Sequence, residues 1–453
     1  MRTSAVKGTY DVLPDAQPRW RHLLGTVRHV LERAGVDELT TPVFEHREVF
    51  EKSVGASADL VVQKEMYTFE DRGGRALTLR PEFTAGVLRA YIEHGMHTWP
   101  APVKLWSHGP AFRAENVQRG RYRQFHQVNC ELVGGSSETL DAEAIALLVD
   151  CLAALGLSGV HVKVGSVGDP ADRERFNAYL REELEPLRES LSDTSRERLR
   201  LNPLRVLDSK DAGDQALVAR LRRPLDLLGP EARAHFEAVT AALDAWGIPY
   251  EVDPSIVRGL DYYRRTAFEV HHGGIGAQSA LGGGGRYDGL IANLGGPDVP
   301  GIGWAFGIER VLDALDGEGL PMPARDRALA YLVPLDTEAV NEVAALAREL
   351  RRAHRVEHGY TARNPGKGLR DADRSGAVLA LLRGARERDA DAVIAKDLRS
   401  GSQELVPLRD LADRLDRAAR SVRDARPDRS GDGDRPSAPD AGGAHDHTRD
   451  ADA

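Results

Sequence analysis

Cysteine and long apolar runs are the features that this sequence most clearly lacks. Its 453 residues include two cysteines, Cys130 and Cys151, which form no CxxC pair, so neither a disulfide framework nor a structural zinc site is indicated. No stretch approaches the roughly 18 apolar residues of a membrane span, and the start MRTSAVKGTYDVLP has no apolar core of a secretory signal. We therefore expect a cytoplasmic protein with reduced thiols.

The composition is that of a globular protein. Hydrophobic residues make up 41% and charged residues 29%, and the length predicts two or three domains. The formal net charge of -9 argues against indiscriminate nucleic-acid binding through a basic surface, but it leaves room for local basic patches. The P-loop motif and a GxGxxG motif opening a βαβ unit are both missing, which excludes the two commonest nucleotide-binding classes.

Hydrophobic periodicity predicts the elements of the first part of the chain. Apolar residues recur at helical spacing over 20–31, which indicates an amphipathic helix before the segment 39–44. That segment, LTTPVF, reads as a strand, and because Pro42 cannot donate to a ladder it belongs at a sheet edge or at a contact with another subunit. Residues 67–134 then read as strand, helix, strand, loop and strand, with Pro81 in the first turn of the helix.

The remainder of the chain divides by composition. Residues 169–247 are charged and Leu-rich with helical periodicity, so they read as a helical insertion within a first domain of residues 1–325. Strand signals resume over 256–305 and end in the helical segment GIERVLDAL. Strands and helices alternate over 326–416, which predicts a separate small α/β domain. Residues 427–453 hold almost no large apolar side chain, so we expect a disordered tail.

The densest cluster of functional groups is FRAENVQRGRYRQFHQVNCELVG, residues 112–134. Two alternating apolar segments flank a loop that carries Arg119, Arg121 and Arg123, which predicts a hairpin with a basic tip. Guanidinium groups match phosphate oxygens in two-pronged geometry, so the hairpin suits a triphosphate or an RNA backbone. On these residues alone, a solvated surface hairpin is the alternative.

Two further clusters follow the insertion. RGLDYYRRTAFEV, residues 258–270, leads into LGGGGRYDGL, in which Gly282 to Gly285 let the backbone turn tightly or pass close to a ligand. GIGWAFGIERV, residues 301–311, places Arg310 in the first turn of a helix with glycines beside it. Read separately, the clusters indicate only a nucleotide-binding enzyme.

Together the three clusters resemble one family. FRxE in a hairpin, GxGxxxGIER at a strand and helix, and a proline-bearing strand after a long helix are similar to motifs 2, 3 and 1 of class II aminoacyl-tRNA synthetases. RGLDYY and GGGGRYDGL resemble the two signatures of histidyl-tRNA synthetases, and the likeness runs from KGTYDVLP at residue 7 to about residue 415, including TLRPEFTAG and NPLRVLDSKD. It implies an α+β catalytic domain with an antiparallel sheet of the class II synthetase type, the helical insertion and a C-terminal α/β anticodon-binding domain.

The resemblance implies a histidine–tRNA ligase, which activates histidine with ATP and transfers it to tRNA(His). Arg113 is then expected to bind the α-phosphate and the histidine carboxylate, with Arg258 as a second catalytic cation on the opposite side. Glu115 and Phe125 are expected to hold adenine, and Arg310 the γ-phosphate. ATP enters as its Mg²⁺ complex, and neither a prosthetic group nor a metal held by protein side chains is expected.

On the amino acid side the resemblance implies a polar pocket. Imidazole offers a donor at one nitrogen and an acceptor at the other, so a carboxylate and a hydroxyl that face each other can recognise it. If an apolar amino acid is bound instead, these buried groups are left without hydrogen-bond partners. The implied substrate-binding residues are Glu82, Thr84 and Gln127 around the ammonium group, with Phe83 between them, Glu131 and Tyr263 at the imidazole, and Tyr262 and Tyr287 along the pocket wall. Core packing by Tyr262 and stabilisation of a helix N-terminus by Glu82 are the structural alternatives.

The implied partners are tRNA(His), L-histidine, ATP and a second copy of the chain, with Pro42 at the interface of a homodimer. The hairpin loop reads ENVQRG where the family more often has ERPQKG, which bears on contacts with the tRNA acceptor end. Gln118 and Arg119 are the candidates for those contacts.

A rival interpretation is a non-catalytic, histidine-binding regulatory paralogue of ATP phosphoribosyltransferase. Such paralogues usually lack the C-terminal domain and erode the histidine-specific signature, whereas Arg258 and the domain after residue 326 are both present. A synthetase-like sensor domain of a protein kinase is excluded, because no kinase signature set occurs in the chain.

Deleting residues 427–453 is expected to leave the melting temperature and histidine activation nearly unchanged, because the segment has no apolar groups with which to pack on a core. The measurement is thermal unfolding of the full and shortened chains together with histidine-dependent exchange of pyrophosphate into ATP. A clear fall in melting temperature would show that the tail packs.

Overall fold

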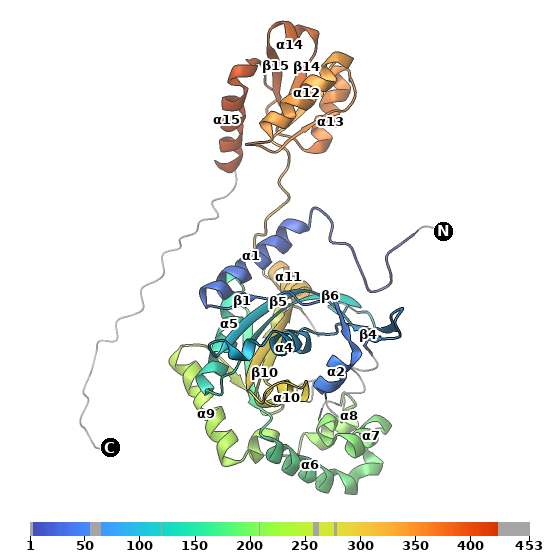
Figure 1. Cartoon of the computed structure of the whole chain (residues 1–453), viewed down its shortest axis with the longest axis vertical. Coiled ribbons are helices and arrows are strands. Elements are labelled where there is room, and N and C mark those ends of the chain that lie inside the picture. The colour runs from blue at the N-terminus through green and yellow to red at the C-terminus, as the bar shows by residue number, and fades with distance from the viewer. Residues whose placement is uncertain are drawn as a thin grey trace, which may run out of the picture. The chain divides into compact units, whose positions relative to one another are not determined.

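The structure, a computed structural model, describes residues 3–54, 65–118, 120–207, 209–256, 262–275 and 279–424. Three sequence predictions fall outside these ranges: those on Arg119, on Arg258 and on the tail 427–453. The chain divides into two compact units, Met1–Arg325 and Asp326–Ala453, which are described one at a time (Figure 1).

The first unit is built on a sheet of eight strands. Their order is β1 (Asp37–Glu38), β5 (Val103–Phe112), β6 (Gln124–Val133), β11 (Gly301–Gly307), β10 (Ala280–Arg286), β9 (Arg264–His272), β7 (Val160–Ser166) and β8 (Glu251–Val252). The six inner strands pair antiparallel, and only the short end strands β1 and β8 pair parallel with their neighbours. The predicted antiparallel sheet is therefore confirmed.

Helices cover both faces of this sheet. The larger core lies under α1 (Gln17–Arg33), α5 (Glu138–Ala154), α9 (Pro230–Ala245) and α11 (Ile308–Gly317). The predicted helical spacing is confirmed in α1, where Leu23, Val27 and Leu31 are fully buried; each such side chain contributes about 1.5–3 kcal/mol to folding. A second core packs α4 (Thr84–Glu93) and α10 (Leu290–Asn293) on the other face, where α2 (Arg47–Val54) contacts both helices.

Both cysteines lie in the larger core. Burial raises the pKa of the Cys151 thiol to about 12 and raises that of Cys130 well above its usual value. Since the thiolate is the reactive form, these residues are inert packing groups.

Two predicted elements differ from the structure. Residues 39–43 form no strand, and side chains bond several of their carbonyl oxygens. The Arg80 guanidinium donates to those of Thr41 and Pro42 at 3.1 and 3.4 Å, and the Ser107 hydroxyl donates to that of Leu39 at 2.5 Å. The chain instead passes here from edge strand β1 to edge strand β2 (Phe44–His46) of a second sheet, in the order β2, β4 (Ala76–Leu79) and β3 (Thr68–Glu70). Helix α4 begins at Thr84 rather than at Pro81.

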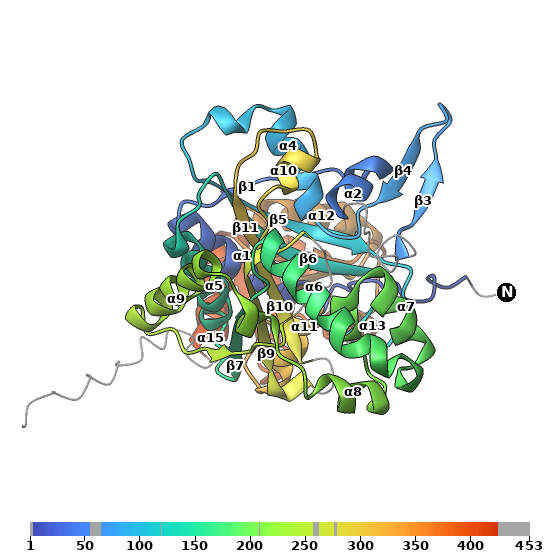
Figure 2. The ribbon, with the colours of Figure 1, turned by 90° about the horizontal axis from the view of Figure 1, so that it is seen from below.

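The predicted helical insertion is confirmed. It contains α6 (Pro170–Leu184), η2 (Glu185–Ser190), α7 (Asp193–Leu201), η3 (Pro203–Val206), α8 (Ala212–Val218) and η4 (Pro224–Leu227), and ends in α9. Helices α6, α7 and α8 gather beside one another around a core of their own (Figure 2).

Buried Asp214 organises the insertion. It accepts hydrogen bonds from the hydroxyls of Ser192, Ser195 and Ser209 at 2.7, 2.6 and 2.6 Å. Burial alone would raise the pKa of Asp214, but these hydrogen bonds outweigh it and lower the pKa to about 2. The carboxylate therefore stays ionised and ties α7 to α8.

The second unit is a small α/β domain. Its sheet has the order β13 (Val356–His358), β12 (Ala330–Pro334), β14 (Leu379–Arg383), β15 (Ala392–Asp397) and β16 (Gln403–Pro407). The helices are α12 (Thr337–Leu350), α13 (Pro365–Ser375), α14 (Ala385–Asp389) and α15 (Leu411–Asp424). The alternation predicted from the sequence is confirmed. In neither unit does a helix among the described residues have the length and apolarity that crossing a membrane requires.

Candidate active site

A cavity of about 560 Å³ opens over the antiparallel sheet, on the face that carries α4. Its wall is shared by the residues that lead into α4, the β5–β6 hairpin, strands β9 to β11 and the start of α11. Arg205, from η3 of the insertion, also lines it.

Glycines of β10 and β11 form part of the cavity wall because the strands leave no room for a side chain. A Cβ on Gly282 or Gly284 would collide with the backbone of β11, and one on Gly303 would collide with the Glu131 carboxylate. The run Gly282–Gly285 lies within strand β10, so the tight-turn alternative was wrong. The glycines instead permit close approach of backbone and carboxylate.

Glu82 has two roles in the structure. Its carboxylate accepts the backbone amides of Thr84 at 2.5 Å and Ala85 at 2.9 Å, which stabilises the N-terminus of α4 and explains why the helix begins there. The same side chain lines the cavity. Burial raises the pKa of Glu82, while these two amides and the charge of Arg113 oppose that rise.

Glu131 lies behind the cavity wall rather than in it. It is 1% exposed, and its carboxylate accepts the hydroxyls of Thr84 and Tyr287, both at 2.6 Å, and the side-chain amide of Asn129 at 2.9 Å. Burial raises its pKa to about 7, although the two hydroxyls oppose that rise. When the Glu131 carboxyl is ionised, both hydroxyl hydrogens point toward it, so the oxygens of Thr84 and Tyr287 can then face the cavity only as acceptors.

The β5–β6 hairpin supplies a cation and an aromatic ring. The Arg113 Nε donates to the Pro81 carbonyl oxygen at 3.0 Å, and its guanidinium carbon lies 5.2 Å from the centre of the Phe125 ring. Farther along the loop, Glu115 and Arg121 form an ion pair at 3.3 Å. All four of these side chains border the cavity, so the predicted hairpin with a basic tip is confirmed as part of its wall.

Arg310 is fixed by backbone carbonyls on both sides. Its Nε donates to Gly120 at 3.1 Å and its Nη1 donates to Ala280 at 2.8 Å. Burial lowers the pKa of Arg310, and the nearby charges of Arg121 and Arg113 lower it further. Arg113 therefore acts electrostatically on Arg310 at one side of the cavity and on Glu82 at the other.

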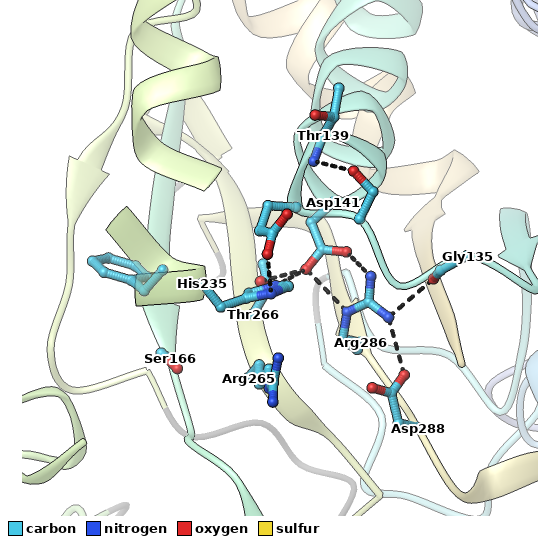
Figure 3. A network of polar contacts seen from close by, with 12 residues as sticks. Gly135, Thr139, Asp141, Ser166, His235, Arg265, Thr266, Arg286 and Asp288 are labelled. Carbon is cyan, nitrogen blue, oxygen red and sulfur yellow. Dashed lines mark hydrogen bonds and ion pairs between the residues drawn. The ribbon is translucent and has the colours of Figure 1, made fainter. Parts of the chain in front are cut away.

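A buried polar network holds the end of β10. Asp141 accepts from His235 at 2.8 Å, from Thr266 at 2.6 Å and from two nitrogens of Arg286 (Figure 3). Arg286 also donates to the Gly135 carbonyl oxygen at 3.1 Å. The network thus joins α5, α9, β9 and β10, and the residue after Arg286 is the cavity residue Tyr287.

Most of the binding and catalytic residues predicted from the sequence line this cavity. Those that line the cavity are Glu82, Phe83, Thr84, Arg113, Glu115, Phe125, Gln127, Tyr262, Tyr263, Tyr287 and Arg310. Gln118 is exposed at the hairpin tip and does not line it, and Glu131 lies behind it. Tyr262 is also a core residue, 8% exposed with its ring 6.2 Å from that of Tyr287, so packing and lining coexist.

Five charged or phenolic residues that line the cavity had no role predicted from the sequence: Glu65, Tyr122, Arg205, Glu269 and Glu309. Arg205 lies in the motif NPLRVLDSKD and Glu309 precedes Arg310, so motif membership was a signal for both. Within the described ranges, His, Cys, Asp and Glu side chains form no group of three or more that could hold a metal ion.

Comparison with known proteins gives a consistent result. The profile of the family described as "Histidyl-tRNA synthetase" matches residues 8–311, and that of "Anticodon binding domain" matches residues 330–417. The chain is 56% identical to histidine–tRNA ligase of Thermus thermophilus, covering 89% of this chain and 96% of that one. It is 51% identical to histidine–tRNA ligase of Deinococcus radiodurans, covering 90% and 98%. The crystal structure of apo S. aureus histidyl-tRNA synthetase superposes with a TM-score of 0.76 at 33% identity, covering 91% of this chain and all of that one.

The buried network yields a stability prediction. Asp141→Asn removes the charge that compensates Arg286, whose side chain is 1% exposed, and is expected to lower the free energy of unfolding by about 3–5 kcal/mol. Asp288→Asn is the matched control, because Asp288 pairs with the same arginine at 3.1 Å but its side chain is 38% exposed; it is expected to cost less than about 1 kcal/mol. Urea unfolding followed by circular dichroism measures both, and equal losses would contradict the assignment.

Proposed function

Because the chain belongs to the histidyl-tRNA synthetase family, we propose that its cavity holds histidine and ATP side by side and joins them as histidyl-adenylate. The histidyl group is then transferred to tRNA(His). Relatives at 51–56% identity are histidine–tRNA ligases, and the anticodon-binding profile matches the second unit, so the regulatory paralogue is not favoured. The reaction takes place in the cytoplasm, where ATP and tRNA are available.

The observation that carries this proposal is the position of Arg113 in the cavity wall. Its Nε donates to the Pro81 carbonyl oxygen at 3.0 Å, next to the acceptor Glu82, which suits the ammonium group of an amino acid. Its guanidinium carbon lies 5.2 Å from the centre of the Phe125 ring, and Arg310 lines the same cavity, which suits a triphosphate. A guanidinium in this place can bind the histidine carboxylate and the α-phosphate together.

Adenylate formation follows from that placement. A carboxylate oxygen of histidine attacks the α-phosphorus, and the bond to the β-phosphate oxygen breaks to release pyrophosphate. Arg113 stabilises the negative charge that builds on the α-phosphate, Arg258 supplies a second cation and Arg310 binds the γ-phosphate. ATP arrives as its Mg²⁺ complex, and the metal neutralises part of the triphosphate charge.

Adenine recognition uses the hairpin. The Phe125 ring offers a stacking surface, with Arg113 5.2 Å from its centre. Glu115 accepts from the exocyclic amine, which distinguishes adenine from a base with a carbonyl group at that position. The ion pair with Arg121 holds the Glu115 carboxylate in place for that contact.

Histidine recognition depends on acceptors. Glu82, Thr84 and Gln127 surround the ammonium group, and the buried carbonyl oxygen of the Gln127 side chain has no hydrogen-bond partner among the described residues. Tyr263 and Tyr287 face the imidazole, with Tyr262 packed against both rings at 4.7 and 6.2 Å. Glu131 acts on the imidazole through Tyr287, whose hydroxyl it turns into an acceptor for a ring N–H.

The second unit binds the anticodon end of tRNA. Tyr360 is 78% exposed with its ring centre 4.5 Å from that of His358, an arrangement that suits stacking on an unpaired base. At the acceptor end, Gln118 on the hairpin tip and Arg119, which lies outside the described residues, remain the proposed contacts.

A second copy of the chain covers the small sheet. Phe44 and Phe69 are 54% and 45% exposed, and they pair with Leu79 and Leu77 of β4, so they lie on one face of this sheet. An exposed apolar face next to Pro42 fits the homodimer interface implied by the sequence.

Glu131→Gln tests the histidine pocket. The amide of glutamine must donate at one position, so one of the hydroxyls that now donate to Glu131 turns its hydrogen toward the cavity. We expect the KM for histidine to rise about tenfold or more with little change in the KM for ATP, measured by pyrophosphate exchange. Glu138→Gln is the control, because that side chain is 44% exposed and lies outside the cavity wall. A variant with both KM values unchanged would contradict the role of Glu131.

Removing residues 326–453 is expected to separate the two half-reactions, because each unit has its own core and the cavity lies in the first. Histidine activation should persist, while aminoacylation should fall through weaker tRNA binding. In the full chain, added salt should weaken tRNA binding, as cations of the protein release counterions from phosphates.

The measurements are pyrophosphate exchange and tRNA affinity for both chains, with sedimentation as the control for dimerisation. If the shortened chain stayed dimeric and bound tRNA as tightly as the full chain, the anticodon-binding role would be wrong.

A further inference from the structure

The segment of residues 6–10 lies along the hairpin that carries Arg113. The Gly8 carbonyl oxygen accepts the backbone amides of Arg123 at 2.8 Å and Gln124 at 3.3 Å. The Arg123 carbonyl oxygen in turn accepts the Arg113 amide at 2.9 Å. The N-terminal segment, which turns at residues 7–8, is thus held against the hairpin through the carbonyl group of Gly8.

Gly8 can make this approach because it has no side chain. Its φ of +87° lies in the left-handed region, and a Cβ there would lie 2.7 Å from Val117 Cγ2 and 2.8 Å from Arg123 Cγ. Any larger residue would push the segment away from the hairpin loop. This contact therefore requires glycine at position 8.

Tyr10 connects the segment to two elements of the cavity wall. Its ring centre lies 5.2 Å from that of Tyr122, in the hairpin loop, and its hydroxyl donates to Glu309 Oε1 at 2.7 Å. Tyr122 and Glu309 line the cavity, whereas Tyr10 does not. Glu309 also accepts the backbone amide of His126 at 2.9 Å.

We propose that Tyr10 is a positioning residue for ATP, which fixes the distance between the hairpin loop and the first turn of α11. The proposal rests on the proposed function, in which these two elements bind one triphosphate. Arg121 precedes Tyr122 and Arg310 follows Glu309, so holding the two contact residues holds the two cations. A spacing set before binding removes the entropy cost of arranging the cations around the ligand.

The chemistry of the contact suits a permanent anchor. Burial raises the pKa of the Tyr10 hydroxyl, and the charge of Glu309 raises it further, so the group stays a protonated donor at neutral pH. The side chain of Glu309 is only 11% exposed, and a hydrogen bond to a carboxylate in such a place is stronger than one between neutral groups.

Tyr10→Phe in the full chain tests the proposal, because it removes the hydroxyl and keeps the ring against Tyr122. In pyrophosphate exchange the KM for ATP is expected to rise about tenfold while the KM for histidine stays unchanged. Gly8→Ala, which displaces the segment, is expected to give the same selective rise. Tyr250→Phe is the matched control: its hydroxyl also donates to a carboxylate, that of Asp244 at 3.3 Å, but it lies outside the cavity wall.

A melting temperature lowered by Tyr10→Phe with both KM values unchanged would overturn the proposal, as would equal rises in both KM values. In a chain that carries Glu309→Ala, adding Tyr10→Phe is expected to change the KM for ATP little further, and a full additive effect would also overturn it. Absence of histidine-dependent exchange in the unmodified chain would instead contradict the proposed function itself.

Discussion

The buried ion pair between Asp141 and Arg286 is the constraint on which the geometry of the cavity depends. Two charges with side chains 0% and 1% exposed are costly to remove from water, and they persist only where every polar atom finds a partner. His235, from the helix that closes the insertion, supplies one of those partners. Because Tyr287 follows Arg286 directly, the ion pair also sets where the Tyr287 hydroxyl meets Glu131. The packing of these helices against the sheet therefore fixes the position of this cavity residue.

Hydrogen bonds of Glu131 connect this network to the start of α4. The Glu131 carboxylate accepts the hydroxyl hydrogens of Thr84 and Tyr287, and the Glu82 carboxylate accepts a backbone amide at the same helix end. This side of the cavity consequently presents acceptors, although burial raises the pKa of both carboxyl groups. The charge of Arg113 partly opposes the rise in the pKa of Glu82. The same cavity wall carries carboxylates and arginines, so it offers partners both to the ammonium group of an amino acid and to a triphosphate.

The charge of the whole chain would not have revealed this arrangement. A net charge of -9 describes an acidic surface, yet Arg113, Arg121, Arg205 and Arg310 all border one cavity. Burial and the charges of Arg121 and Arg113 lower the pKa of Arg310, while the charges of Glu115 and Glu309 oppose that fall. The local field, and not the sum of charges, governs what binds there.

Local signals in the sequence predict the amphipathic helix at 20–31, the hairpin, the insertion and the motifs to which most of the cavity residues belong. The strand prediction failed where the partner of a polar group is distant in the chain. The segment 39–43 is not a strand, and its carbonyl oxygens at Thr41 and Pro42 bond to Arg80 while that at Leu39 bonds to Ser107. Periodicity likewise gave no sign that Thr84 and Tyr287, 47 and 156 residues away, would meet Glu131. Periodicity reports which side chains are buried, since burial of apolar groups is non-directional. Hydrogen bonds are directional, so which buried polar groups meet depends on the three-dimensional arrangement of elements that are distant in the chain.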